Sequence, residues 1–374
     1  MSDFQLVAPC LFGLEGPLGD ELRRMGAENV QPQNGRVVFG GSPEMIARAN
    51  ICSRYGERVQ ILMGTFPARS FEELFQGVKA LPWEQWISKN DAFPVKGSCL
   101  DSKLASVPDC QAIVKKAVVE RLKQKYTVNW FEEIGAPRQI HFLIFKDQAS
   151  IMIDTTGPGL HKRGYRANAT EAPIRETLAA AMVYFSRVRH DANFIDPFCG
   201  SGTILIEAAL AALNIAPGAG RRFAAEDWAQ VGSGVWKQER ERARSLEMHD
   251  AGFMSKGYDI DRDAVALSKE NAVKAGVANR IRVEQRAVAD FSEEGEFGCV
   301  ICNPPYGERL LDLHAAEELY RTMGRVFEPR HGWSYAVICP DETFESCFGR
   351  RSVRRRKLYN GMIRCQYYMY FGEK

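Results

Sequence analysis

Short apolar runs alternate with amphipathic stretches along the C-terminal half of the chain. Runs at 193–196, 256–261, 281–290 and 299–302 read as strands, and the first two are followed by helix-like stretches that end near residues 212 and 275. Strands alternating with helices predict a parallel, doubly wound α/β sheet. Because parallel strands end at one edge of a sheet, polar residues that follow them are expected to lie close together.

The N-terminal half alternates in the same way over shorter distances. Its first part predicts strand, helix and strand at 5–11, 18–25 and 36–39. Its second part predicts strands at 59–63, 92–96, 140–145 and 149–154, with helices at 71–80 and 109–123. The last two strands are close enough for a hairpin. By pattern alone, this half is a generic α/β module.

Composition narrows the class of protein. A chain of 374 residues with 45% hydrophobic residues is long enough for two or three packed domains. It has no apolar run of about eighteen residues, which a membrane span requires. Residues 1–4 lack a signal-peptide profile. The ten cysteines show neither paired nor metal-ligand spacing, which predicts reduced thiols in a cytoplasm and no metal.

A glycine-rich turn follows the strand at 193–196. Gly200 and Gly202 permit a tight bend and let the backbone approach a ligand, while Ser201 and Thr203 are candidate caps of the next helix. The spacing is not the G-x-G-x-x-G of dinucleotide sites. Taken alone, the turn is better explained as a tight strand–helix connection.

Acidic residues follow the next two predicted strands. Asp259 and Asp261 stand at the end of the second strand, where this fold class grips ribose hydroxyls, and Asp290 ends the third, where its carboxylate can accept from an adenine amino group. Each has an alternative role as a helix cap or a solvated loop residue. Their order along one predicted sheet favours a pocket for an adenosine.

The fourth strand leads into Asn303-Pro304-Pro305-Tyr306. The two prolines lack N–H donors, so this backbone offers carbonyl oxygens, and Asn303 adds its side-chain oxygen. Acceptors of this kind suit a planar amino group, and Tyr306 can stack on the ring that carries the amine. Asn-Pro-Pro also occurs in ordinary turns.

Together with 196–203, the segment 303–310 resembles the class I S-adenosylmethionine-dependent RNA methyltransferases that carry a THUMP domain, in particular the bacterial group that makes N2-methylguanine in large-subunit (23S) ribosomal RNA. The resemblance implies a Rossmann-like methyltransferase domain at 157–374, a THUMP RNA-binding domain at 59–156 and a ferredoxin-like element at 1–58. It implies a catalytic motif made of Asn303, Pro304, Pro305 and Tyr306. It also implies binding of S-adenosylmethionine by Asp196, Pro197, Cys199, Gly200, Ser201, Gly202, Thr203, Asp259, Ile260, Asp290 and Asn303.

The segments around the predicted methyltransferase domain carry further expectations. Residues 154–159 resemble an interdomain linker, and the helix that begins near 173 is expected to place Arg175, Glu176 and Thr177 beside the cofactor or to use them as caps. The insertion at 217–252 is longer than a simple connection, which predicts a helix pair packed on the sheet.

With a formal net charge of only +2, any nucleic-acid surface must be local. Two basic segments, residues 161–166 and 350–357, are candidates, and the alternative for each is a solvated face. The RNA contacts expected from these segments and from the segment 303–310 are Lys162, Arg163, Tyr165, Arg166, Arg309, Arg354, Arg355 and Arg356.

The predicted activity is therefore methyl transfer from S-adenosylmethionine to the exocyclic amine of a base, with ribosomal RNA or a pre-ribosomal particle as partner. Three alternatives remain open at the level of sequence: methylation of adenine N6 in RNA or DNA, methylation of a protein glutamine amide, and a non-catalytic RNA-binding protein. Oligomeric state is left open.

Overall fold

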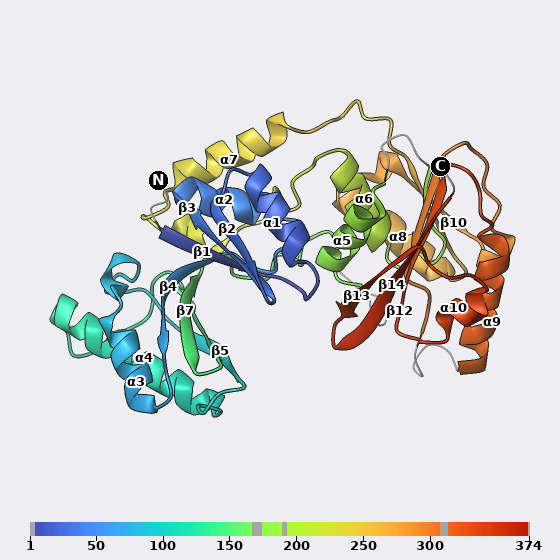
Figure 1. The fold of residues 1–374 in the computed structure, drawn as a ribbon. Coiled ribbons are helices and arrows are strands. Elements are labelled where there is room, and N and C mark those ends of the chain that lie inside the picture. Colours follow the sequence, from blue (N-terminus) through green and yellow to red (C-terminus); the bar gives the residue numbers. More distant parts are fainter. Residues whose placement is uncertain (1–3, 167–173, 189–192, 307–312, 373–374) are drawn as a thin grey trace. The chain divides into compact units, whose positions relative to one another are not determined.

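The computed structural model describes residues 4–166, 174–188, 193–306 and 313–372 (Figure 1). The chain divides into two compact units. The N-terminal unit contains Met1–Cys10, Gly19–Leu160 and Arg222–Glu241, and the C-terminal unit contains Leu11–Leu18, His161–Arg221 and Arg242–Lys374. The connection between the units is therefore not a single linker, because the chain passes from one to the other after residues 10, 18, 160, 221 and 241.

The N-terminal unit is built on one seven-stranded sheet in the order β2-β3-β1-β4-β7-β6-β5. Antiparallel pairing of Leu6 with Ile61 joins the strands that precede residue 58 to those that follow it. Its elements are β1 (Phe4–Pro9), α1 (Glu15–Arg24), β2 (Glu28–Gln33), β3 (Arg36–Gly41), α2 (Pro43–Cys52), β4 (Gln60–Pro67), α3 (Phe71–Ala80), β5 (Val95–Leu100), α4 (Val107–Tyr126), β6 (Ile140–Phe145) and β7 (Gln148–Asp154). Residues Leu11–Leu18, which include the first turn of α1, belong to the other unit.

Residues 154–159, expected to be a linker, lie within the N-terminal unit. Asp154 is the last residue of β7 and is buried, and Arg58 donates to its Oδ2 at 2.6 Å. Asn50 donates to Thr155 at 2.9 Å and accepts from Thr156 at 2.6 Å. This buried polar network fixes the segment after β7, so the linker expectation was wrong for these residues.

The insertion also departs from expectation. It contains a 3₁₀ turn (Ala224–Asp227) and one α-helix, α7 (Ser233–Ser245), rather than a helix pair. Residues 222–241 belong to the N-terminal unit, where the backbone N–H of Ala225 donates to Thr155 O at 3.0 Å. Trp228 is buried beneath the Arg138 guanidinium, 4.2 Å from its ring centroid. Apolar burial therefore draws this part of the insertion away from the sheet on which it was expected to pack.

The C-terminal unit carries a second seven-stranded sheet in the order β10-β9-β8-β11-β12-β14-β13. The first five strands of that order are parallel, while β14 is antiparallel to both β12 and β13. The elements are α5 (Glu176–Ser186), β8 (Asn193–Asp196), α6 (Thr203–Ala212), β9 (Ser255–Asp259), α8 (Arg262–Lys274), β10 (Ile281–Gln285), β11 (Gly298–Cys302), α9 (Leu313–Val326), β12 (Trp333–Cys339), α10 (Phe344–Phe348), β13 (Arg354–Asn360) and β14 (Ile363–Phe371). The predicted α/β class is confirmed.

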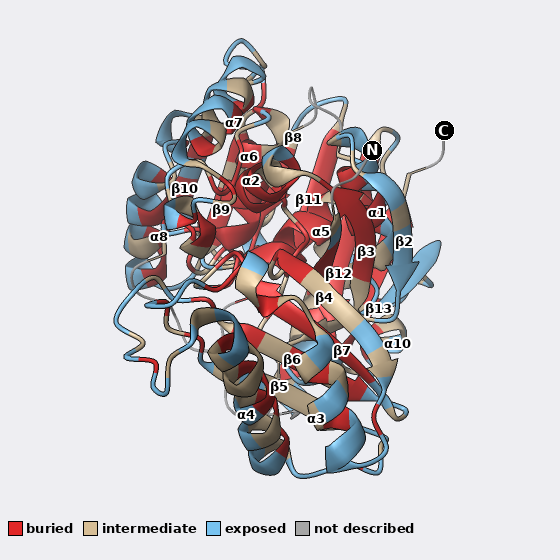
Figure 2. Cartoon of the chain, turned by 90° about the vertical axis from the view of Figure 1, so that its left-hand side faces the viewer, coloured by how far each residue is buried: buried red, intermediate tan, exposed pale blue. Residues whose placement is uncertain are grey.

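The core of the C-terminal unit explains why its central strands are so apolar. All residues of β11 are buried, as Figure 2 shows by their red colour. Tyr320, Phe327 and Phe344 from the region of α9 and α10 pack on the same cluster as Val300 and Ile195. Strands covered on both faces need continuous rather than alternating apolar sequence. In the part of the chain that the structure describes, no helix has the length and apolarity needed to span a bilayer.

Replacing Trp228 by Ala is expected to lower the free energy of unfolding of the N-terminal unit by about 3–5 kcal/mol, since it removes a large buried side chain and its cation–π contact. Urea unfolding of the purified full chain measures the change. Trp130→Ala is the matched control because Trp130 is 80% exposed. Equal destabilisation by the two variants would contradict the assigned packing of the insertion.

Candidate functional site

Three neighbouring parallel strands end together in the C-terminal unit. Asp196 ends β8, Asp259 ends β9, and Asn303 follows the last residue of β11. Strand order runs from β8 to β9 on one side and to β11 on the other. The carboxyl ends of β8 and β11 thus flank the point where the order reverses, which is where open α/β sheets bind their ligands.

Backbone N–H groups of the glycine-rich turn after β8 donate hydrogen bonds to residues of β9. The N–H of Gly200 donates to Asp259 Oδ2 at 2.9 Å, and the N–H of Cys199 donates to Tyr258 O at 2.9 Å. Asn271 of α8 donates to Ser201 O at 2.9 Å. The turn is therefore held on one side of the reversal point before any ligand arrives.

Two glycines make this close approach possible. Gly202 has φ of +78°, and a Cβ there would lie 2.3 Å from Ser268 Oγ. Gly257, in β9, has no room for a side chain either, because its Cβ would lie 2.5 Å from Leu205 of α6. The sequence singled out Gly202 but not Gly257, since a lone glycine in a strand signals close packing only when the opposite helix is known.

The helix cap differs from the prediction. Gly202 is the N-cap of α6, without a side-chain capping hydrogen bond. The hydroxyls of Ser201 and Thr203 lie 3.1 Å from each other instead, and both residues are buried. Neither serves as the predicted cap.

Beyond β9, the predicted cofactor residues differ in accessibility. Asp259 is partly exposed, and its Oδ1 accepts from the N–H of Asp261 at 3.0 Å. Ile260 is 71% exposed, and Asp261 caps α8 by accepting from Asp263 N–H at 2.8 Å. Asp290 is exposed in a 3₁₀ turn (Val288–Asp290), because β10 ends at Gln285 rather than continuing to residue 290.

Asp196 is the most electrostatically unusual group of the site. Burial raises the pKa of its carboxyl to about 8, a hydrogen bond from the Phe198 N–H opposes this rise, and the nearby Asp259 carboxylate adds to it. Among the described residues, no cation pairs with either carboxylate. In the ligand-free protein the Asp196 carboxyl is therefore largely protonated at neutral pH, and a bound cation would favour its ionised form. Pro197 and Cys199 beside it are buried, and burial raises the pKa of the Cys199 thiol.

On the other side of the reversal point, Asn303 carries an unused acceptor. Its Oδ1 is buried and has no hydrogen-bond partner. Pro304 is buried, and Pro305 and Tyr306 are partly exposed. The Tyr306 hydroxyl accepts from Asn360 Nδ2 at 2.7 Å, and burial raises the pKa of this phenol. The hydroxyl is thus anchored to the end of β13, so the ring is the part of Tyr306 available to a ligand.

Three family models match successive parts of the chain: the RlmL ferredoxin-like domain at residues 5–60, the THUMP domain at 68–154, and the RMKL-like methyltransferase domain at 163–369. The last covers more than half of the 374 residues. The chain belongs to the THUMP-containing, RlmL-like methyltransferase family. The predicted resemblance is thereby confirmed at the level of the family.

Individual members of this family match over almost the whole chain. The "Putative RNA methyltransferase YpsC" of Bacillus subtilis is 44% identical over 375 residues, covering 100% of this chain and 97% of the relative. The ribosomal RNA large subunit methyltransferase K/L of Psychromonas ingrahamii is 34% identical over 96% of this chain, which spans only 49% of that relative's length. The solved structure of SMU.472, complexed with SAH, has 42% identity and a TM-score of 0.94, covering 100% of this chain and 99% of that one.

The basic segment that opens the methyltransferase domain was misassigned. Arg163 and Tyr165, predicted to contact RNA, are buried and bind Glu207 of α6, with Arg163 Nη2 at 3.3 Å and Tyr165 Oη at 3.0 Å from its carboxylate. Arg166 pairs with Glu176 at 3.2 Å. The buried Arg163 and Tyr165 side chains cannot reach a phosphate backbone while folded. Of the four contacts predicted in this segment, Lys162 is exposed and Arg166 is partly exposed.

The remaining predicted residues fall into three groups. Glu176 and Thr177 are buried at the start of α5 and Arg175 is its N-cap residue. Arg309 lies outside the described residues. Arg354, Arg355 and Arg356 are exposed on β13, as a phosphate-contacting surface requires.

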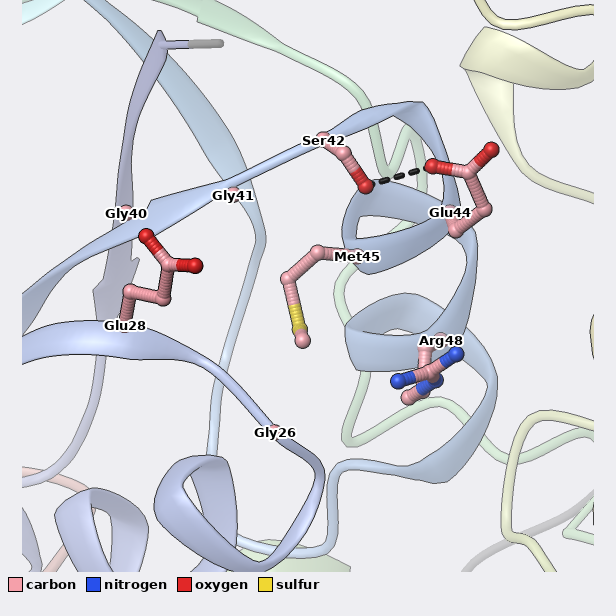
Figure 3. Close-up of a pocket in the computed structure, with 8 residues that line it drawn as sticks. All are labelled: Gly26, Glu28, Gly40, Gly41, Ser42, Glu44, Met45 and Arg48. Carbon is pink, nitrogen blue, oxygen red and sulfur yellow. Dashed lines mark hydrogen bonds between the residues drawn. The ribbon is translucent and has the colours of Figure 1, made fainter. Parts of the chain in front are cut away.

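A pocket in the N-terminal unit is lined by none of the predicted site residues. It lies between the start of β2, the end of β3 and the start of α2, and Figure 3 shows Ser42 donating to Glu44. Its one cation, Arg48, is already paired with Glu239 at 2.7 Å. Carboxylates of Glu28 and Glu44 disfavour an anionic ligand there.

The buried pair between α6 and the segment before it yields a stability test. Glu207→Leu removes the carboxylate from a buried Arg163 and is expected to cost about 3–5 kcal/mol in urea unfolding. The double variant Glu207→Leu/Arg163→Met is expected to recover most of that loss, because no buried charge is left. Asp227→Ala breaks an exposed pair and is the control, with an effect below about 1 kcal/mol. A double variant as unstable as the single one would contradict the argument.

Asp196 yields a pH test. Because its folded-state pKa is raised, the folded chain retains a proton that the unfolded chain has released, so this group lowers stability as pH rises from about 4 to about 8. Asp196→Asn keeps an acceptor for Phe198 N–H but removes the titration. In the ligand-free protein, its stability relative to the parent is expected to increase by a few kcal/mol from about pH 5 to pH 8. Urea midpoints across that range measure it, and a difference independent of pH would overturn the assignment.

Proposed function

We propose that this protein is an S-adenosylmethionine-dependent methyltransferase that modifies the exocyclic amine of a base in RNA, with N2 of a guanine in large-subunit ribosomal RNA as the substrate atom. The residues implied by sequence are proposed to act in the roles predicted for them, except for Arg163, Tyr165 and Arg166. Support comes from polar groups of the site that have no protein partner, and from the relatives.

The residues at the ends of β8 and β9 fit S-adenosylmethionine. Asp196 and Asp259 supply two carboxyl groups without a protein cation, and a bound ammonium or sulfonium group would favour ionisation of Asp196. Each oxygen of Asp259 accepts one backbone N–H and retains capacity for a ribose hydroxyl. Around Gly200, whose φ is +50°, no atom lies within 4 Å of the position a Cβ would take, so the turn leaves space for the ligand.

The observation that carries the proposal is the orphaned Asn303 Oδ1. A buried acceptor without a partner costs about 1–3 kcal/mol, and a ligand N–H would recover that loss. Asn303 lies across the strand-order reversal from the glycine-rich turn, so an amine held there faces the cofactor position. SMU.472, whose structure contains SAH, supports the identity of the cofactor.

S-Adenosylmethionine, when bound, supplies an electrophilic methyl group on sulfur. Asn303 Oδ1 and the Pro304 carbonyl would accept the two N–H groups of the target amine, orienting its nitrogen and stabilising the positive charge that develops there. The Tyr306 ring would stack on the base. The site's remaining contribution is alignment, which is worth roughly 7–11 kcal/mol in well-oriented reactions. A paired base would have to be flipped out first.

RNA as the substrate class is supported by the THUMP match at 68–154 and by the names of YpsC and the K/L relatives. We propose the division of labour expected from sequence: a ferredoxin-like element at 1–58, a THUMP RNA-binding domain at 59–156 and a methyltransferase domain at 157–374. A ribosomal RNA or pre-ribosomal particle as partner would place the enzyme in the cytoplasm.

Asn303→Ala is expected to lower the rate of methyl transfer to ribosomal RNA by about 100-fold or more, since the loss of one positioned hydrogen bond to the developing charge has effects of that size. The measurement uses labelled S-adenosylmethionine with total RNA, total protein and genomic DNA, followed by nucleoside analysis. Label in N2-methylguanosine of large-subunit RNA is the expected result.

Asn279→Ala is the matched control, because Asn279 is exposed in a 3₁₀ turn of the same unit. Asp259→Ala is expected to abolish binding of S-adenosylmethionine itself. Label in N6-methyladenosine would show that adenine, not guanine, is the target base. Label in protein or DNA would show that RNA is not the substrate. Cofactor binding without transfer to any pool would refute catalysis on these substrates.

A further inference from the structure

The hairpin formed by β13 and β14 occupies one edge of the C-terminal sheet and is drawn in red in Figure 1. Its strands pair from Arg354↔Met369 to Asn360↔Ile363, and Gly361 and Met362 form the turn. One end of this hairpin reaches the candidate site directly, since Asn360 donates to the Tyr306 hydroxyl at 2.7 Å. Whatever binds the tip of the hairpin lies next to the motif that holds the target amine.

An exposed aromatic pair stands near the tip of the hairpin, where Tyr359 projects from the face opposite to that of Asn360 because successive strand residues alternate between faces. Phe12 and Tyr359 pack edge to face with ring centroids 6.1 Å apart. Phe12 is 58% exposed, and Tyr359, one residue before Asn360, is partly exposed. Although Phe12 comes from the beginning of the chain, residues Leu11–Leu18 belong to the C-terminal unit.

The position of Phe12 is set by the next residue. Gly13 has φ of +92°, and a Cβ there would lie 3.0 Å from the Lys357 carbonyl oxygen and 3.3 Å from a methyl of Leu358. A glycine is needed for so close an approach to the β13 backbone. The exposed ring of Phe12 is thus placed against the hairpin by a tight backbone contact.

Cations surround the two rings. The Lys357 ammonium lies 5.4 Å from the Tyr359 ring centroid, and Arg364 is paired with Tyr359 across the hairpin, so its side chain projects from the same face. Both cations are exposed, and within the described structure neither forms an ion pair with a carboxylate. Exposed aromatic rings between unpaired cations are the combination that binds single-stranded nucleic acid, by stacking on bases and attracting phosphates.

We propose that Phe12, Tyr359, Lys357 and Arg364 form a stacking platform for the nucleotides that flank the target base in single-stranded RNA. The platform rests on the proposed function, because it takes RNA as the substrate. It adds a base-stacking contact made jointly by the start of the chain and the last hairpin. Stacking of a flanking base there would hold the strand open while the target base reaches Asn303.

The test is the affinity of the full chain for a fluorescein-labelled single-stranded RNA of about twelve nucleotides, measured by anisotropy over a range of salt concentrations. Tyr359→Leu and Phe12→Ala are each expected to weaken binding about five- to fifty-fold with an unchanged salt slope, since each removes a stacking surface. Tyr359→Phe is expected to retain affinity. Lys357→Gln is expected to reduce the salt slope by about 0.7, the contribution of one phosphate contact.

Two controls separate stacking from structural damage. Leu246→Ala removes a similarly exposed apolar side chain from outside the proposed RNA-binding domain and is expected to bind like the parent protein. Binding of SAH is expected to be unchanged in every variant. An abasic oligonucleotide of the same length should bind the parent more weakly and be indifferent to Tyr359→Leu.

The platform is overturned if the parent protein does not bind the RNA, if Tyr359→Leu and Phe12→Ala bind like Leu246→Ala, or if Tyr359→Phe is as weak as Tyr359→Leu. A loss confined to Lys357→Gln would also overturn it, because it would indicate phosphate attraction without stacking. These outcomes do not depend on methyl transfer. A parent that binds RNA through this platform but transfers no methyl group would refute only the proposed activity.

Discussion

The hydrogen bond from Gly200 N–H to the Asp259 carboxylate is the constraint on which the candidate site depends. It joins the turn after β8 to the end of β9, and so fixes the glycine-rich backbone relative to the neighbouring strand. The bond is possible because Gly202 adopts a positive φ and because Gly257 leaves room for α6. Larger side chains at these two positions would push α6 and α8 away from the turn that they support.

This arrangement concentrates carboxyl groups and unused acceptors at one sheet edge. Asp196 is buried near Asp259, and Asn303 Oδ1 is buried without a partner on the adjacent strand. If nothing bound here, these buried polar groups would only reduce the stability of the fold. They are explained if a cation and an amine are bound here. The surrounding polar groups, by contrast, are paired: Arg163 with Glu207, and Arg166 with Glu176.

The two units are interleaved in sequence rather than arranged end to end. Residues 11–18 belong to the C-terminal unit although the strands before and after them belong to the other, and residues 222–241 show the reverse exchange. Trp228 and Phe12 illustrate the consequence. Each packs in a different unit from the segments that flank its own segment in the sequence. Mutations in either segment therefore affect a unit that local sequence would not implicate.

Local sequence was sufficient where one segment decides its own structure. The helix at 71–80 and the strand at 140–145 agree with α3 and β6, because periodicity and turn residues mark their ends. The order of strands and polar ends was likewise enough to indicate the strand ends that carry Asp196, Asp259 and Asn303, since parallel topology brings such ends to one edge.

Tertiary structure decided everything that depends on a distant partner. The run from His161 to Arg166 reads as a basic surface, yet Glu207 lies more than forty residues away and buries Arg163 and Tyr165 in an ion-paired network. The strand at 281–290 stops at Gln285, which moves Asp290 into a turn. The role of Phe12 depends on Tyr359, at the other end of the chain. Charge and periodicity are local properties of a sequence, whereas burial and pairing depend on which remote segments the fold brings into contact, and only the folded chain contains that information.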